Sequence, residues 1–538
     1  MTTVAAGTRS GPTSLRKDER TPPFRRVLVA NRGEIALRIV RACHDVGTEA
    51  VAVYSDADAG AAHVRAADDA VRIGPAPAAE SYLRPQAIID AALGSGCEAV
   101  HPGYGFLAER AEFARLVEDA GLRWVGPSAD TIAAVGDKLA ARRLATTARV
   151  PVVPGMVEPA RIRPDALDDL VAVGREIGFP LLVKASAGGG GRGMRRVADP
   201  DELVRALSAG AAEAEAAFGD ATVYLEREVR PARHVEVQLL GDASGSVVAL
   251  GERDCSLQRR HQKLIEEAPA PGLDPEQRRE LHEMAVRIGR AAGLVNAATA
   301  EFLLDPSGRF WFLEVNTRLQ VEHGVTELVA DVDIVVEQLY IAGGAELSPS
   351  LVAAAGMATE PTRHAIEVRL SAEDPSAAFA PAPARVGRWR MPAGPGVRVD
   401  TAVEAGDRIP PDYDPLIAKI MTVGPDRAAA IARMKRALDE VEITGIQTTL
   451  PFHRFVFRDA TFIDAELSTD WVAEHWDGPG ERRARRETAR RAATALIESQ
   501  EDAGATRPVS LRKDSTGLTS ASTWRATGRR VATERWPR

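Results

Sequence analysis

The chain has 538 residues, 45% of them hydrophobic, and a formal net charge of −8 at pH 7. This length suffices for about three domains with real cores. The acidic balance gives no reason to expect nucleic acid as a partner, and no apolar run approaches the ~18 residues of a membrane helix. Cys43, Cys97 and Cys255 show neither zinc spacing nor a disulfide framework, so we expect a reducing, cytoplasmic location.

The first 137 residues divide into an arm and a domain. Residues 1–23 are rich in Thr, Ser and Arg and lack the apolar core of a secretory signal. We interpret them as a disordered arm, with an organellar presequence as the alternative. Residues 24–137 repeat a strand–turn–helix–strand pattern, which predicts an open α/β domain. Its loops ANRGE and HPGYGFLAE follow strands, where such sheets hold ligands, although an ordinary turn is the simpler interpretation.

A run of glycines occurs in ASAGGGGRGMR, residues 185–195. The apolar run FPLLVK before it and the residues GMRRVAD after it predict two strands, and a helix is expected to begin at Asp199. A dinucleotide-binding fingerprint would need a helix directly after the glycines, so that interpretation is excluded. A flap over phosphates and a plain mobile loop remain equally supported by the glycines alone.

The stretch ARHVEVQLLGDASGSVVALGERD predicts a hairpin, because Val235, Val237 and Leu239 alternate in it and DASG suits a turn. A second hairpin, TAEFLLDPSGRFWFLEVN, carries carboxylates among aromatic residues. If its turn centres between Ser307 and Gly308, Glu301 faces Glu314, and Asn316 shares their face. Carboxylates directly opposite on a sheet repel each other unless a cation lies between them. Two carboxylates and an amide oxygen suit Mg²⁺. The alternative is a solvated hairpin in another register.

Charged residues cluster in three further places. Arg318 and Glu322 follow the hairpin and could clamp phosphoryl charge and accept a proton, or form a surface ion pair. The stretch ERDCSLQRRHQKLIEE, which contains Lys263, is either a solvated basic loop or a pocket for phosphate or bicarbonate. Lys184 lies in an apolar run and needs a partner if buried, for which a phosphate would serve.

The C-terminal third begins with a Pro/Ala/Gly-rich stretch near residue 345. The alternating strand HAIEVRLSAED and an amphipathic helix over 426–443 predict a last globular piece. Residues 481–538 contain fourteen basic and seven acidic residues, so the rest of the chain is more acidic than the net charge suggests. We interpret this tail as a frayed helix followed by disorder.

Taken together, these motifs closely resemble the biotin carboxylase family from about Arg26 to Trp471. The resemblance rests on ANRGEIALRI, HPGYGFL, GDK, the glycine run, ERDCS-QRRHQK, EEAPAPG, E-NTR-QVEH-VTE and YD--I-K. It implies mixed α/β and α+β architecture, namely an ATP-grasp fold with a Rossmann-like N-terminal domain, a glycine-loop lid and a β-rich C-terminal domain. The implied bounds are 24–137 for the N-terminal domain, 138–345 for the ATP-grasp domain with its lid at about 155–228, and 360–470 for the C-terminal domain.

The resemblance also implies site residues. Bicarbonate would be bound by Lys263, Arg318 and Val321 and deprotonated by Glu322, while Arg369, with Arg318, would bind biotin and stabilise its enolate. Magnesium, or Mn²⁺, would be held by Glu301, Glu314 and Asn316. The ATP contacts would come from Lys138, Lys184, Gly190, Gly191, Glu226, Arg227, Glu228, Val229, His234, His261, Glu301 and Glu314.

The implied reaction is that of a C–N bond-forming ligase. Bicarbonate attacks the γ-phosphate of ATP, giving carboxyphosphate and ADP, and biotin is then carboxylated with release of phosphate. This is the first half-reaction of acyl-CoA carboxylases such as those of fatty acid biosynthesis. The alternatives are another ATP-grasp ligase or an inactive assembly subunit, although the intact charged residues argue against the latter.

The implied partners follow from what the chain lacks. The family's biotinylated lysine lies between two methionines, whereas Lys435 lies in a predicted amphipathic helix, and the polar tail does not suit a β-barrel carrier. We therefore expect a separate biotin carboxyl carrier protein or biotin-bearing carboxyltransferase subunit, and a homodimer by resemblance. Three residues depart from the family pattern: Ala187, Arg227 and Gly324, the last of which replaces a proline and could loosen the loop that carries Glu322.

Overall fold

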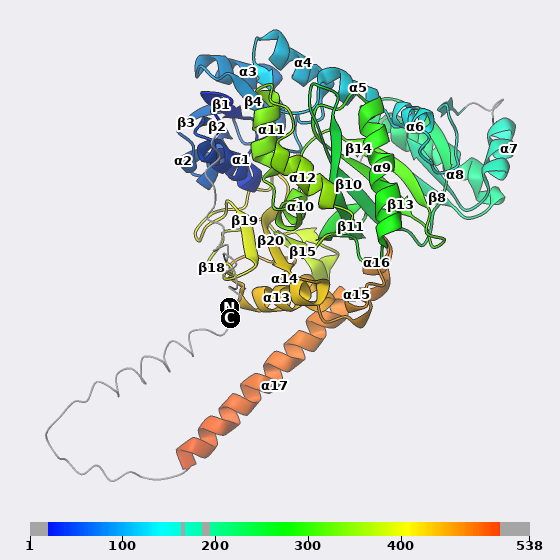
Figure 1. Cartoon of the computed structure of the whole chain (residues 1–538). Helices are drawn as coiled ribbons and strands as arrows, with labels where there is room; N and C mark the ends of the chain where they lie inside the picture. Colours follow the sequence, from blue (N-terminus) through cyan, green and yellow to red (C-terminus); the bar gives the residue numbers. More distant parts are fainter. Residues whose placement is uncertain (1–19, 163–166, 186–193, 506–538) are drawn as a thin grey trace, which may run out of the picture.

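The computed structural model of the chain describes residues 20–162, 167–185 and 194–505. Most of the glycine run, including Gly190 and Gly191, lies outside these residues, and so does Ala187. Three larger sheets organise the described chain, and helices pack around them (Figure 1). The expected mixed α/β and α+β architecture is confirmed.

The N-terminal sheet has five parallel strands in the order β3-β2-β1-β4-β5. Its central strands are buried on both faces, which explains their continuous apolar sequence. The strands are β1 (Arg26–Val29), β2 (Glu49–Ser55), β3 (Asp69–Gly74), β4 (Ala99–His101) and β5 (Arg123–Trp124). The helices are α1 (Gly33–Asp45), α2 (Ala62–Ala66), α3 (Pro85–Gly94), α4 (Ala111–Asp119) and α5 (Ala129–Gly136).

A small four-stranded sheet, in the order β6-β9-β7-β8, carries the glycine run. The run lies between β7 and β8, which pair antiparallel, so the expected strand–loop–strand arrangement is confirmed for its flanks. Asp199 caps α8 as expected, and Glu202 accepts a hydrogen bond from the backbone N–H of Ala198. The elements are α6 (Lys138–Thr147), β6 (Ala160–Arg161), α7 (Leu167–Ile177), β7 (Leu181–Ala185), β8 (Met194–Val197), α8 (Pro200–Phe218) and β9 (Thr222–Arg227).

The largest sheet has eight antiparallel strands in the order β14-β13-β10-β11-β12-β15-β20-β19. Its strands are β10 (Arg233–Gly241), β11 (Val247–Arg259), β12 (Gln262–Ala268), β13 (Asn296–Leu304), β14 (Phe310–Asn316), β15 (His364–Ser371), β19 (Val397–Thr401) and β20 (Leu416–Gly424). The helices in this part are α9 (Pro275–Ala291), α10 (His323–Ala330), α11 (Ile334–Ala342), α12 (Pro349–Met357), α13 (Arg427–Glu440), α14 (Leu450–Val456), α15 (Ala460–Ile463) and α16 (Trp471–His475). Two short ribbons complete it, β16 (Glu373–Asp374) with β17 (Ala380–Pro381) and β18 (Trp389–Arg390) with β21 (Glu442–Ile443).

This sheet crosses the expected boundary between the ATP-grasp and C-terminal parts. β12 pairs with β15, so residues on either side of the Pro/Ala/Gly-rich stretch belong to one hydrogen-bonded sheet. Arg369 on β15 is thereby placed in the same sheet as Lys263 on β12. The continuous sheet is the reason that charged residues far apart in sequence meet at one site.

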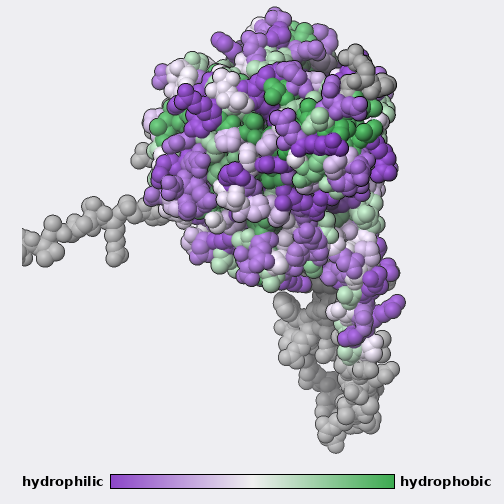
Figure 2. Space-filling view, turned by 90° about the vertical axis from the view of Figure 1, so that its right-hand side faces the viewer, coloured by the Kyte–Doolittle hydropathy of each residue, from purple (hydrophilic) through white to green (hydrophobic). Residues whose placement is uncertain are grey.

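Helix α17 (Gly478–Ala505) projects from the body (Figure 1). Residues 481–505 are therefore helical, where the sequence predicted a frayed helix and disorder; 506–538 lie outside the described residues. Its first turns contact the body, because Arg482 pairs with Asp374 at 3.1 Å and Arg485 donates to the carbonyl oxygen of Pro451 at 2.9 Å. The face seen in Figure 2 is mainly hydrophilic, with hydrophobic residues scattered among the hydrophilic ones. Among the described residues, no helix combines the length and apolar character needed to cross a membrane.

Candidate active site

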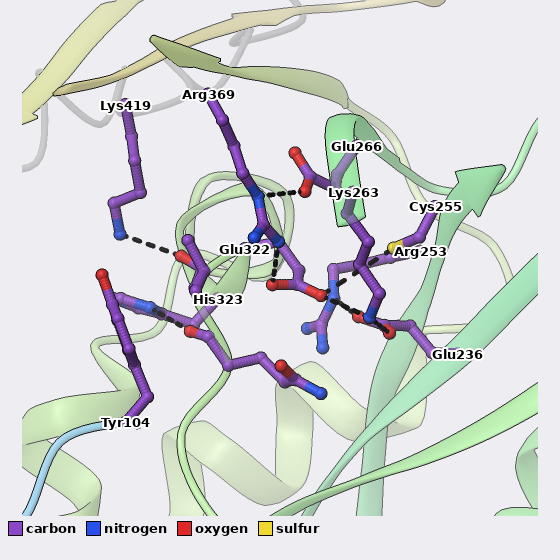
Figure 3. A network of polar contacts seen from close by, with 12 residues as sticks. Tyr104, Glu236, Arg253, Cys255, Lys263, Glu266, Glu322, His323, Arg369 and Lys419 are labelled. Carbon is purple, nitrogen blue, oxygen red and sulfur yellow. Dashed lines mark hydrogen bonds and ion pairs between the residues drawn. The ribbon is translucent and has the colours of Figure 1, made fainter. Parts of the chain in front are cut away.

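Lys263 lies at the centre of a buried charge cluster (Figure 3). Its Nζ contacts Glu236 at 2.5 Å, Glu322 at 2.8 Å and Glu301 at 3.0 Å. Burial disfavours the charged amine, but these carboxylates outweigh it and raise the pKa of Lys263 well above its ordinary value. The lysine therefore remains charged and holds together three acidic side chains from three different elements.

Glu322 precedes α10 and is fully buried. One carboxylate oxygen accepts from Lys263, and the other accepts from Nη2 of Arg369 at 2.8 Å. Burial alone would raise its pKa, but Lys263 and Arg369 reverse this and hold the pKa of Glu322 well below its ordinary value. The ionised carboxylate is thus available to accept a proton from a ligand that displaces one of its cations.

Glu301 and Glu314 face each other across β13 and β14, as the sequence predicted. The predicted turn centre was wrong, because Leu304 pairs with Phe310, but a β-bulge between Glu301 and Phe302 restores the expected pair. Burial, followed by the charge of Glu301, raises the pKa of Glu314. A cation between the two carboxylates would relieve this repulsion.

The two carboxylates of this pair suit a hard divalent cation, and Asn316 and His234 both contact Glu301. Nδ2 of Asn316 donates to Glu301 at 2.7 Å, and Nε2 of His234 lies 2.9 Å from Glu301. Carboxylate and amide oxygens are the ligands that Mg²⁺ prefers. Two other groups of potential metal ligands lie close together, and both include Glu236. Their carboxylates already contact the ammonium group of Lys263. Glu301, Glu314 and Asn316 therefore remain the predicted metal ligands.

Lys184 has a protein partner where the sequence suggested a phosphate. Its ammonium pairs with Glu226, which also pairs with Arg142. Burial of Lys184 thus does not by itself require a ligand. Arg142 was missed from the sequence because nothing in GDKLAARR separates it from the other basic residues of that helix.

The basic stretch from Glu252 to Glu267 is a strand hairpin, not a loop as its solvated interpretation required. β11 and β12 turn at Arg260 and His261, which both have positive φ values of 49° and 66°, as the twist of a tight hairpin favours. Arg253 is fully buried and donates to Glu236 at 2.7 Å. The basic residues therefore lie in different environments: Arg253 is buried in the protein, whereas His261 and Lys263 line the cavity.

Arg318 and Val321 lie on the segment between β14 and α10. Nε of Arg318 lies 2.9 Å from Glu109 of the N-terminal part, and its Nη1 donates to Gln320 at 2.7 Å. The carbonyl oxygen of Val321 accepts from the buried Lys419 at 2.9 Å. These contacts fix the segment between the N-terminal part and the large sheet.

Gly324 is closely packed against Met421. It lies in the first turn of α10, and a Cβ atom there would lie 2.3 Å from the sulfur of Met421. Met421 fills the space that a larger residue at 324 would need. The departure from the family pattern is therefore accompanied by close packing against Met421, and the loosened loop remains a prediction.

One cavity of about 1370 Å³ joins these groups. Glu322 is the one predicted residue among those described that does not line it, because Lys263 and Arg369 cover its carboxylate. The predicted residues that line the cavity are Lys138, Lys184, Glu226, Arg227, Glu228, Val229, His234, His261, Lys263, Glu301, Glu314, Asn316, Arg318, Val321 and Arg369.

Glu236 was missed from the sequence although it contacts Lys263 and Arg253. It lies on β10 between His234 and Gln238, with Val235 and Val237 on the opposite face. The alternating valines predict the strand, and the polar residues alternate with them on its other face. Three buried polar side chains on one face of a strand were the signal that could have found it.

Comparison with known proteins identifies relatives of this chain over most of its length. Family models described as biotin carboxylase N-terminal domain, carbamoyl-phosphate synthase L chain ATP-binding domain and biotin carboxylase C-terminal domain match residues 23–132, 137–350 and 367–474. A biotin carboxylase of Nostoc sp. is 48% identical over 84% of this chain and 99% of its own length. The Pseudomonas aeruginosa biotin carboxylase is 49% identical over 83% and 97%.

The chain belongs to the biotin carboxylase family. A crystal structure of the biotin carboxylase domain dimer of Hydrogenobacter thermophilus 2-oxoglutarate carboxylase, in complex with MgADP, ADP and bicarbonate, superposes with a TM-score of 0.79. That domain is 43% identical and covers 84% of this chain and 98% of its own. The family assignment, the ATP-grasp architecture and the enzyme class expected from the sequence are confirmed. Helix α17 lies beyond the residues that the family models match.

Proposed function

We propose that this biotin carboxylase uses MgATP and bicarbonate to carboxylate biotin carried on a separate chain. The observation that carries the proposal is that Lys263, which lines the cavity, joins two centres. Lys263 contacts Glu301, which faces Glu314, and it also contacts Glu322, which is held by Arg369. Lys263 therefore links the site proposed for phosphoryl transfer to the site proposed for proton removal.

The bicarbonate step uses Lys263, Arg318 and Glu322. Bicarbonate would replace one of the carboxylates that Lys263 now contacts. Arg318 would be its second cation, and the backbone at Val321 would lie beside it. Glu322 would accept the bicarbonate proton, and the freed oxygen would attack the γ-phosphate of ATP, giving carboxyphosphate and ADP. Lys138, Lys184, His234, His261 and the segment 226–229 would hold the nucleotide.

Magnesium, or Mn²⁺, would be held by Glu301, Glu314 and Asn316 and would offset the charge of the nucleotide phosphates. Gly190 and Gly191 would cover those phosphates from the lid. Carboxyphosphate would then release CO₂ and phosphate, the phosphate would take the proton from N1 of biotin, and N1 would attack the CO₂ to form the C–N bond. Arg369, with Arg318, would stabilise the oxygen of the biotin enolate.

The proposed partners are a biotin-bearing carrier chain and a second copy of this chain. The dimer is supported by the dimeric relative. A separate carrier is supported by Lys435, which lies within helix α13 and has a methionine on one side only, unlike the family's biotinylated lysine. The proposed docking element for the carrier is the tail from residue 481, because Trp476 and Gly478 at its base line the cavity. A cytoplasmic location is supported by three free, buried cysteines.

The test is turnover of purified protein with free biotin. We expect MgATP hydrolysis to require bicarbonate and to accelerate on addition of biotin. Heat-treated protein and a Lys263→Ala variant serve as controls for contaminating ATPases. Turnover at full rate without bicarbonate, or insensitivity to biotin, would contradict the proposal.

A further inference from the structure

A second carboxylate pair lies beside Arg369, away from the proposed metal. Glu266 on β12 and Glu367 on β15 are directly opposite each other in antiparallel strands. Both side chains are fully buried. Arg369 lies two residues beyond Glu367 and therefore on the same face of β15. The pair and the arginine thus form one group beneath the cavity.

The hydrogen bonds of this group are unequal. Nε of Arg369 donates to one oxygen of Glu266 at 2.5 Å, while its Nη2 donates to Glu322 at 2.8 Å (Figure 3). Among the described residues, the second oxygen of Glu266 and both oxygens of Glu367 have no hydrogen-bond partner. Glu367 is therefore a buried carboxyl group that no donor satisfies, and a bare negative charge there would be very costly.

The surrounding charges do not remove this cost. Those that face Glu367 are Arg369 on its own strand, Lys419 on β20, Glu266 on β12 and Glu322 before α10. Lys419 is itself engaged by the carbonyl oxygen of Val321 and by Glu34 at 3.3 Å. Burial raises the pKa of Glu367 well above its ordinary value, and burial also raises the pKa of Glu266 to about 7. Two facing carboxyl groups in this setting hold at least one proton.

We infer that Glu266 and Glu367 share one proton and act as a positioning pair for Arg369 in the biotin step. This inference rests on the proposed function. In this arrangement Glu367 is neutral, its proton lies toward Glu266, and the ionised Glu266 holds Nε of Arg369. Neither bond that Arg369 makes to a carboxylate uses Nη1. The guanidinium is therefore fixed at two nitrogens while a third is left for a ligand.

The inference predicts different effects on biotin carboxylation when each of the two glutamates is replaced. Glu367→Gln keeps a neutral donor opposite Glu266, so we expect carboxylation of free biotin within about twofold of the wild-type rate. Glu266→Gln removes the charge that holds Nε, so kcat/KM for biotin should fall about tenfold to a hundredfold. Bicarbonate-dependent ATP cleavage without biotin should stay within about threefold, because Glu322 keeps its contact with Lys263.

A pH profile adds a readout that a purely structural role would not move. Below about pH 7 Glu266 would take up a proton and release Arg369, so kcat/KM for biotin should decline on the acid side. Glu266→Gln should abolish that decline, and Glu367→Gln should keep it. The matched control is Glu267→Gln, since Glu267 is the next residue on β12 and pairs with His364 and Arg427 instead. That variant should lower thermal stability without separating the two half-activities.

Infrared spectroscopy and stability give a test that does not depend on activity. Wild-type protein at pH 8 should show the band of a buried protonated carboxyl group, which Glu367→Gln removes. Because the native state keeps a proton that the unfolded chain releases above the ordinary glutamate pKa of 4.5, the pair should lower wild-type stability as pH rises above that value, and the fall should be less steep in Glu367→Gln. Loss of activity in Glu367→Gln, or an unchanged carboxyl band, would overturn the inference. Biotin-independent turnover by the wild-type protein would instead overturn the proposed function.

Discussion

Charged residues occur in two contrasting settings in this molecule. In the cavity, Lys263 contacts three carboxylates and its side chain is 11% exposed. On helix α17, Arg491 pairs with Glu487 one turn away, and their side chains are 79% and 62% exposed. The buried cluster can have strong effects because little solvent screens it, whereas an exposed pair contributes little. A cluster of charged residues therefore indicates function only where the fold buries it.

The largest effect is expected from Glu322, at the centre of the buried cluster. Glu322→Gln keeps the shape but removes the base, so bicarbonate-dependent ATP cleavage should fall by ~10²-fold or more. Initial rates of ADP release with and without bicarbonate measure this loss. A rate within a fewfold of the wild-type enzyme would show that another group accepts the proton.

Arg369 should separate the two halves of the reaction. Arg369→Ala should lose carboxybiotin formation by ~10²-fold or more, because the enolate oxygen loses its cation. Much of the bicarbonate-dependent ATP cleavage should remain, since Lys263 still contacts Glu322. Parallel assays of ADP and carboxybiotin measure both. Equal losses in the two assays would refute the division of roles between Arg369 and Glu322.

Gly324 tests the packing that supports the cluster. Gly324→Ala places a Cβ atom against Met421 and should cost about 1–3 kcal/mol of stability. Adding Met421→Ala should recover part of that cost, so the double variant should be more stable than the sum of the two single changes predicts. Thermal unfolding midpoints measure the three variants. Strict additivity would show that the two residues do not compete for space.

Deletion of the tail tests the role of the exposed helix α17 and the residues after it. Deletion of residues 481–538 should leave turnover with free biotin near the wild-type value, because no predicted site residue is lost. Turnover with the biotinylated chain that co-purifies with the tagged full-length protein should fall. Equal turnover of that carrier by both forms would show that the tail does not dock it.

The smallest effect is expected on the exposed part of α17. Arg491→Ala removes an exposed i,i+4 pair and should change stability by no more than about 0.5 kcal/mol. The thermal unfolding midpoint measures it. A much larger change would mean that this part of the helix is buried against a partner in solution.

The sequence predicted the cavity better than it predicted the contacts within it. Glu301 and Glu314 were paired correctly even though the turn centre was misplaced, because a bulge adds one residue to β14. Such a bulge leaves no clear mark in a single sequence. The partners of Lys184 and Lys263 were not predictable for a related reason: each lies on a different element, and long-range pairing depends on the assembled sheets.

The central claim is that bicarbonate attacks ATP at this buried cluster, and oxygen labelling tests it most directly. With ¹⁸O-labelled bicarbonate, MgATP and free biotin, the attacking oxygen stays on phosphorus when carboxyphosphate breaks down. Mass spectrometry of the released phosphate should therefore detect one labelled oxygen for each carboxybiotin formed, and Glu322→Gln should form little of either product. Unlabelled phosphate released together with carboxybiotin would contradict the account, because the phosphoryl group would then have been transferred without bicarbonate.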